Sequence, residues 1–281
     1  MEQKTIDKIV ENLTMKGNSK ITIRNYCYSI KRFSKYHEGK ELEKLTEEDV
    51  LNYLKVNFIN KKLSAETYNH HVSAINFFYA LIYNKTFNKF KLPRCKVRKK
   101  VPTLISNELI MKIITEEPNL KYKAWLALAY GSGLREIEIA TIKIEHIFSK
   151  ENKIKVLGKF NKERFTVLPD FTVNILRQYY KHKKMLKKYG YLFEGIKNND
   201  YMSSRCIINY FLTIKQKYNL PEDFTFHSLR HSFATNFLKN SNDLMTLKSL
   251  LGHSSITSTA IYLHMANDYS NTYSPLGDNN V

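Results

Sequence analysis

The chain has 281 residues, 43% of them hydrophobic, which suits two domains that each bury a core. Its 45 lysines and arginines against 26 acidic residues give a formal net charge of +19, which predicts a polyanionic partner, either nucleic acid or an anionic membrane surface. Membrane is the poorer choice, because the longest apolar stretch, residues 74–83, is broken by Asn76 and is far shorter than the roughly 20 residues that span a bilayer, and no basic-then-apolar leader opens the chain.

Residues 1 to about 84 are expected to be helical throughout. In residues 21–38 and 64–84 apolar side chains recur at three- and four-residue steps, which is typical of a helix with one buried face, and a serine opens the second segment as a plausible N-cap. Thr46 and Asp49 approximate a capping box that begins a further helix. The pattern predicts a bundle of four or five helices with basic outer faces, which alone fits an ordinary solvated surface as well as a DNA-binding one.

A basic stretch follows at residues 85–101, with eight lysines or arginines and no acidic residue. Pro93 and Pro102 discourage helix there. Such a stretch between two folded units is either a plain linker or a segment that crosses a phosphate backbone, and its position favours the second interpretation. Its candidate DNA-binding residues are Lys96, Arg98, Lys99 and Lys100.

From Thr103 onward the chain is expected to be mainly helical, with one β interruption. Helical patterns cover residues 106–116, 120–131, 134–142, 170–188, 203–218, 226–239, 243–251 and the segment from Ser255. Segments 153–157 and 164–168 alternate across a short turn and predict a hairpin, to which 144–148 could add a third strand. The tail after Met265 is polar and is expected to add little to the core.

Four residues near the C-terminus stand at intervals that suit one kind of chemistry. His227 and Arg230 lie in HSLRHSFAT, and residues three apart share one helix face, so both can point at the same small anion. His253 follows 23 residues later, in a turn after the helix-ending Gly252, and Tyr262 comes nine residues after that. H-x-x-R alone arises often by chance, but the ordered set suits attack of a phenol on a phosphodiester.

These motifs resemble those of the tyrosine site-specific DNA recombinases, which include phage integrases and Xer-type recombinases. The family box reads H-x-L-R-H-x-x-A-T, then L-G-H-x-x-x-x-T, then a tyrosine. The family's upstream arginine is matched by Arg135 in GSGLREIEIATI, and its hairpin lysine by Lys159 in VLGKFNKERFTVLP. The resemblance spans roughly residues 100 to 265 by motif and the N-terminal third by helical pattern only. One departure is Phe160, because the Xer-type hairpin usually has glycine there, and this affects the turn that aims the lysine.

The resemblance implies a mainly α fold in two domains. Residues 1–84 would form a helical, SAM-like core-binding domain, and residues 85–101 a basic linker. Residues 102–273 would form a mainly α catalytic domain with a small antiparallel hairpin or three-stranded sheet, followed by a tail to residue 281.

The resemblance also implies a site-specific recombinase that cleaves and rejoins DNA strands through a 3′-phosphotyrosine intermediate. Neither a metal, ATP nor another cofactor is expected, and the three scattered cysteines offer no zinc pair. The arginines would bind the phosphate, and the lysine would protonate the leaving oxygen. His227 and His253 would share two roles, accepting the proton of the tyrosine and donating a hydrogen bond to the phosphate, and His227 is preferred as the acceptor. His231 and Glu138 would be structural supports. The implied catalytic set is Arg135, Lys159, His227, Arg230, His253 and the nucleophile Tyr262.

Simpler interpretations exist for each residue taken alone. Arg135 could merely pair with Glu138 on the same helix, and Lys159 could be a solvated turn residue, because Lys162 is equally placed. Tyr262 is one of 19 tyrosines. Six such coincidences in the right order are implausible together.

The expected partners are double-stranded recombination sites and other copies of the chain, in a homotetramer on DNA that a second recombinase could join. No membrane partner is expected, and the location would be the cytoplasm, at the nucleoid. Xer-like dimer resolution and integration or excision of a mobile element fit equally well. Two alternatives are a type IB topoisomerase-like enzyme that relaxes DNA and a catalytically inactive DNA-binding regulator.

Overall fold

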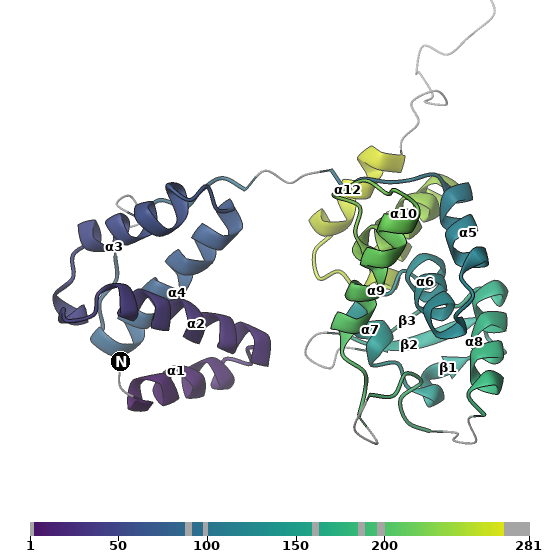
Figure 1. The fold of residues 1–281 in the computed structure, drawn as a ribbon, viewed down its shortest axis with the longest axis horizontal. Helices are drawn as coiled ribbons and strands as arrows, with labels where there is room; N and C mark the ends of the chain where they lie inside the picture. The colour runs from purple at the N-terminus through teal and green to yellow at the C-terminus, as the bar shows by residue number, and fades with distance from the viewer. Residues whose placement is uncertain are drawn as a thin grey trace, which may run out of the picture. The chain divides into compact units, whose positions relative to one another are not determined.

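The computed structural model describes residues 3–87, 92–97, 101–158, 163–184, 189–195 and 200–266, and forms two compact units, Met1–Lys100 and Val101–Val281 (Figure 1). Both units are mainly helical, and the second contains a small antiparallel sheet. The expected fold class is therefore confirmed. In the described part of the chain, no helix combines the length and the apolar character needed to cross a bilayer.

In its described residues, the first unit has four α-helices around an aromatic core. Both the serine N-cap of α4 and the capping box of Thr46 and Asp49 are present, as the sequence predicts. Phe33 and Tyr53 lie at the centre of the core and are fully buried. The helices are α1 (Gln3–Met15), α2 (Lys20–Tyr36), α3 (Glu47–Leu54) and α4 (Ala65–Tyr83), with a short 3₁₀ turn η1 (Leu42–Lys44) and a π-helical turn η2 (Lys55–Ile59).

Part of the basic stretch lies along α4 instead of crossing open solvent. The side chain of Asn69 donates to the carbonyl of Cys95 at 2.9 Å and accepts from its backbone N–H at 2.9 Å. Arg94 donates to the hydroxyl of Ser73 at 2.9 Å. Residues 92–97 have no regular secondary structure and belong to the first unit.

The core of the second unit is built around α6. This helix has six consecutive buried residues, 124–129, so it is apolar on every side and must be surrounded. Helices α5, α7, α8 and α10 contact it. The helices are α5 (Asn107–Glu116), α6 (Leu120–Ser132), α7 (Glu136–Ala140), α8 (Asp170–His182), α9 (Ser204–Lys217), α10 (Phe226–Ser241), α11 (Leu244–Leu251) and α12 (Thr257–Ala266).

The sheet has the strand order β1-β2-β3, with all neighbours antiparallel. The strands are β1 (Ile147–Phe148), β2 (Lys153–Leu157) and β3 (Glu163–Val167), and a 3₁₀ turn η3 (Ile144–His146) precedes them. The β2–β3 register pairs Ile154 with Thr166 and Val156 with Arg164. Because residues two apart in a strand share a face, the polar Thr166 and Arg164 lie on the inward face of β3.

Three elements are shorter than the sequence pattern predicts. The third strand has only two residues, because a 3₁₀ turn takes up the first part of 144–148. Helix α8 ends at His182 and not at 188, after its last buried residue, Tyr179. Helix α7 is a single turn that begins after Arg135, whose backbone N–H is capped by Glu138 at 2.9 Å.

Candidate active site

Helix α10 carries three of the motif residues on neighbouring turns. His227 and His231 are partly buried, with ring centroids 4.7 Å apart, and Arg230 lies between them with only 1% of its surface exposed. The helix begins at a Thr225–Ser228 capping box and packs against α6 and α12. It therefore holds the arginine rigidly inside the unit.

Two backbone carbonyls fix the guanidinium of Arg230. Its Nη1 donates to the carbonyl of Gly133 at 2.6 Å, and its Nη2 donates to the carbonyl of Leu251 at 2.7 Å. These carbonyls stand where α6 and α11 end, and both helices end in a left-handed glycine, Gly133 with φ +64° and Gly252 with φ +65°. A glycine suits this conformation because it has no Cβ. The glycines of the two motifs thus shape the socket for this arginine.

A single buried carboxylate, Glu138, gathers three arginines. Its Oε1 accepts from Arg135 at 2.9 Å and from Arg164 at 2.7 Å, and its Oε2 accepts from the second Nη of Arg164 at 2.9 Å. Nη1 of Arg230 lies 3.5 Å from Oε2. Arg164 also donates from Nε to the carbonyl of Leu250 at 2.7 Å, so it joins strand β3 to the end of α11.

This cluster holds an excess of two positive charges, because three guanidinium groups face one carboxylate. Burial raises the pKa of Glu138, but the hydrogen bonds and charge of Arg164 outweigh it, and the net pKa is lowered. Glu138 is therefore ionised at neutral pH. Arg135 keeps 34% of its side chain exposed and uses one guanidinium nitrogen on the carboxylate. Its remaining donors have no partner among the described residues, which suits the binding of an anion from outside.

Tyr262 lies in the same cluster, on α12. Its side chain is 2% exposed, and its hydroxyl is 2.8 Å from Nδ1 of His231. Its ring stacks on that of His253, with centroids 6.4 Å apart and planes at 15°. Burial raises the pKa of Tyr262, and the charges of Arg230 and Arg135 partly offset this. The phenol is therefore protonated at neutral pH.

His253 connects the tyrosine to the arginines. Its Nε2 is 3.3 Å from Nη2 of Arg230, and its Nδ1 is 2.9 Å from the hydroxyl of the buried Thr259. Because an arginine side chain can only donate hydrogen bonds, Nε2 must be the acceptor in the contact with Arg230. Nδ1 therefore carries the hydrogen of the ring and donates the hydrogen bond to the hydroxyl of Thr259. The tautomer of this histidine is thereby fixed in the free protein.

The three histidines at the site are held neutral. Burial, followed by the charge of nearby arginines or of His227, lowers the pKa of His227, His231 and His253 to about 4 in each case. The ordinary pKa of a histidine is 6.5. Between these two pKa values the three histidines therefore bind protons in the unfolded chain but not in the folded one. The stability from these groups is complete above pH 6.5 and is lost as the pH falls towards 4.

We expect the second unit to become easier to unfold between pH 7 and pH 5, by about 2 kcal/mol for each of the three histidines. Trp125 reports on this unit alone, because it is the only tryptophan of the chain and lies in that core. Its fluorescence in urea titrations measures the change. A His253→Asn variant should show a shallower pH dependence, and a urea midpoint that stays constant from pH 7 to pH 5 would contradict the neutral histidines.

The structure brings together five of the six residues that the sequence singles out. Lys159 and its competitor Lys162 lie outside the described residues, and so do Arg98, Lys99 and Lys100. Lys96 is exposed in the first unit. The five that share one cluster are Arg135, His227, Arg230, His253 and Tyr262.

Sequence reasoning missed two members of the cluster and understated a third. Arg164 ties the hairpin to Glu138, Thr259 fixes the ring of His253, and His231 contacts the tyrosine hydroxyl directly. No local signal identified Arg164, because the alternating apolar residues of β3 are Phe165 and Val167, which stand on the opposite face of the strand.

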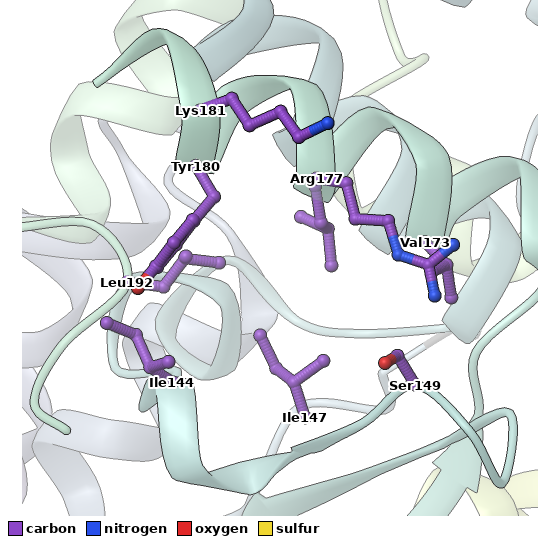
Figure 2. A pocket seen from close by; sticks show the side chains of 9 residues that line it. Ile144, Ile147, Ser149, Val173, Arg177, Tyr180, Lys181 and Leu192 are labelled. Carbon is purple, nitrogen blue, oxygen red and sulfur yellow. The ribbon is translucent and has the colours of Figure 1, made fainter. Parts of the chain in front are cut away.

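An open and mostly apolar pocket of this unit lies elsewhere. It has a volume of about 260 Å³ and shares no residue with the arginine cluster. Figure 2 shows Ile144, Ile147 and Leu192 facing Arg177 and Lys181 of α8 across it.

A family model described as the phage integrase family matches residues 105–268, which is more than half of the chain and includes all six candidate catalytic residues. The chain belongs to the phage integrase family. A second model, the phage integrase N-terminal SAM-like domain, matches residues 6–89. Members of the phage integrase family are tyrosine recombinases, and this chain is thus an enzyme that cleaves and rejoins DNA.

Relatives in the phage integrase family cover nearly the whole chain. Tyrosine recombinase XerC of Staphylococcus epidermidis is 30% identical over 280 residues, which cover 93% of this chain and 94% of that protein. Tyrosine recombinase XerA of Pyrococcus horikoshii is 29% identical over 266 residues, covering 92% and 87%. The crystal structure of a XerA recombinase matches with 25% identity and a TM-score of 0.53, over 95% of this chain and 94% of that one. A lambda integrase (75–356) dimer bound to a COC′ core site shares the fold, with 17% identity, a TM-score of 0.73 and 99% of each chain covered.

Proposed function

We propose that this chain is a site-specific recombinase that cuts DNA by joining Tyr262 to a 3′-phosphate and rejoins it by the reverse reaction. One observation carries the proposal: a tyrosine hydroxyl lies in the same cluster as three guanidinium groups that share one carboxylate. The excess positive charge suits a phosphodiester, whose transition state gains negative charge.

Arg135 and Arg230 would bind the non-bridging oxygens of the scissile phosphate. A guanidinium group offers paired donors in a plane, and both arginines are aimed by contact with the same carboxylate. Arg135 is the more accessible of the two, with a third of its side chain exposed. Arg230 has a buried Nε without a partner among the described residues, so it keeps one unused donor.

His253 would donate to a phosphate oxygen once DNA is bound. In the free protein its Nε2 accepts from Arg230, so the donor role requires Arg230 to turn to the phosphate and the imidazole to gain a proton. A bound phosphate favours that proton, because it offsets the charges of Arg230 and Arg135 that help to lower the histidine pKa.

The proposed partners are double-stranded recombination sites and three further copies of this chain, in a homotetramer on DNA that a second recombinase could join. Solved structures of the same fold include complexes with DNA, among them a XerH recombinase bound to its difH substrate and the lambda integrase dimer at a core site. The net charge of +19 supports a DNA partner here. The first unit would bind DNA as a core-binding domain, and the exposed Lys96 together with Arg98, Lys99 and Lys100 would contact phosphates.

A plasmid assay tests this function. Duplexes that the protein binds are first selected from a random pool, and two copies of the selected site are placed on one supercoiled plasmid. A recombinase should convert this plasmid to deletion or inversion products and leave a plasmid without sites unchanged. Relaxation of both plasmids would instead indicate a type IB topoisomerase-like enzyme, and binding without cleavage would indicate an inactive regulator.

Lys159 is the proposed general acid for the leaving 5′ oxygen. We expect Lys159→Ala to slow strand cleavage by about 100-fold or more, within the usual range for removal of a general acid. A substrate with a 5′-bridging sulfur should restore the rate, because a thiolate leaves without a proton. Lys162→Ala is the matched control and should cleave at the unmodified rate. Failure of the sulfur substrate to rescue Lys159→Ala, with rescue of Lys162→Ala instead, would move the role to Lys162.

A further inference from the structure

The geometry points to His231 as the base that takes the proton from Tyr262 when the DNA strand is cut. This inference rests on the proposed function, because it assigns a step of that same reaction. It replaces the residue that the motif alone favours, His227, by its neighbour one turn along α10.

Direct contact distinguishes His231 from the other two histidines. Its Nδ1 lies 2.8 Å from the hydroxyl of Tyr262, which is hydrogen-bond distance, and the two rings are tilted by 46° with centroids 5.6 Å apart. If Nδ1 donated to the phenol oxygen, the phenolic hydrogen would be left buried without a partner. A buried donor without a partner costs more than an unused lone pair on an oxygen. The phenol therefore donates to Nδ1, and the proton already points at its acceptor.

The neighbouring histidines are not placed for this step. Both ring nitrogens of His253 have other partners, namely Arg230 and Thr259, and its ring lies parallel to that of Tyr262 and not edge-on to the hydroxyl. His227 packs at 85° against the ring of His231, and it makes no hydrogen bond with another described residue. His227 is therefore free to face the phosphate, while His231 faces the nucleophile.

The charge around His231 suits a base that works only when DNA is bound. Burial first, then His227 and Arg230, lowers the pKa of His231 to about 4, so its lone pair is available in the free protein but attracts a proton weakly. A phosphodiester bound by the arginines brings negative charge next to Arg230. The negative charge of the phosphate offsets the positive charge of Arg230, which otherwise lowers the pKa of His231. The proton affinity of His231 is therefore higher at the time of attack.

The O–H bond of Tyr262 breaks and its proton goes to Nδ1 of His231, while the phenol oxygen forms a bond to phosphorus. The bond from phosphorus to the 5′ oxygen breaks, and that oxygen takes a proton from the general acid, for which Lys159 is proposed. Rejoining reverses each transfer, and the imidazolium of His231 returns the proton to the departing Tyr262.

Chemical rescue tests the assignment with a matched pair of variants, His231→Ala and His227→Ala, on a nicked duplex that carries the selected site and traps the covalent adduct. We expect His231→Ala to form the adduct about 100-fold more slowly or worse. Added imidazole should restore its rate in proportion to concentration, because it fills the space and accepts the proton. His227→Ala should also be slow, but imidazole should not restore it. Rescue of His227→Ala in place of His231→Ala would overturn the inference.

His231→Asn separates the base from a mere support. Asparagine can still accept the hydrogen bond of Tyr262 through its side-chain oxygen, but it cannot take the proton. Its urea midpoint by Trp125 fluorescence should stay near that of the unmodified protein, while adduct formation falls about 100-fold. If His231→Asn formed the adduct at the rate of the unmodified protein, His231 would not be the base, although the proposed function would still stand. Absence of any adduct in the unmodified protein would overturn the proposed function as well.

Discussion

Replacing Tyr262 by phenylalanine is expected to abolish the covalent adduct with DNA while DNA binding stays within about twofold. The reaction loses its nucleophile, and a loss of at least about 10⁴-fold is typical when a covalent nucleophile is removed. The ring itself should stay in place, because it packs in a small core with Phe233, Leu247 and Leu251. Adduct on a denaturing gel and binding by mobility shift measure the two effects on the same preparation.

Matched tyrosine variants complete this test. Tyr179→Phe also removes the hydroxyl of a buried tyrosine in the same unit, outside the arginine cluster, and should leave the adduct unchanged. Tyr269→Phe and Tyr273→Phe should likewise retain it, because neither residue keeps the nine-residue interval from His253. If the adduct persisted in Tyr262→Phe and disappeared in Tyr269→Phe or Tyr273→Phe, Tyr262 would not be the nucleophile.

Replacing Glu138 by glutamine is expected to lower the free energy of unfolding of the second unit by about 3 kcal/mol, because breaking a buried ion pair leaves its partners uncompensated. The change keeps the shape of the side chain but removes the one carboxylate that faces three arginines. The guanidinium groups should then repel one another, and we expect adduct formation to fall about 100-fold as Arg135 and Arg230 lose their alignment.

Glu136→Gln is the control for this change. Glu136 lies two residues earlier in α7, is partly buried and makes no ion pair with another described residue, so its change to glutamine breaks no ion pair and should alter stability by no more than about 1 kcal/mol. Urea unfolding followed by Trp125 fluorescence compares the two variants. Equal midpoints would mean that Glu138 does not hold the arginines against their mutual repulsion.

Much of the fold could be predicted from the sequence, because local signals agree with the tertiary structure. Serine and threonine N-caps begin α4 and α3 where the sequence places them, and Gly252 ends α11 before His253. Helix lengths were less predictable. Helix α8 stops after its last buried residue, Tyr179, although the residues that follow favour helix as well.

Strand β3 shows why part of the site could not be predicted. By the usual alternation, Phe165 and Val167 would face the core, but they are 48% and 37% exposed. Arg164 and Thr166 face inward instead, because Arg164 binds Glu138 and Thr166 donates to the carbonyl of Ser132. Only the position of a carboxylate 26 residues earlier explains this inversion, and no local pattern encodes it.

The candidate catalytic residues could be found because their order and spacing are specific. The division of labour among the histidines could not, because it depends on which ring nitrogen faces which group. His231 follows Arg230 directly in the motif, and only the packing of α12 against α10 places its Nδ1 beside the hydroxyl of Tyr262.

Location of the DNA–protein bond tests the central claim most directly. The covalent adduct is digested with nuclease and trypsin, and the nucleotide-bearing peptide is fragmented in a mass spectrometer. Because no lysine or arginine follows Lys248, the peptide 249–281 contains three tyrosines, so fragment ions must separate them. We predict a nucleotide linked through its 3′-phosphate to Tyr262, and a nucleotide on Tyr269, on Tyr273 or on any residue outside this peptide would contradict that claim.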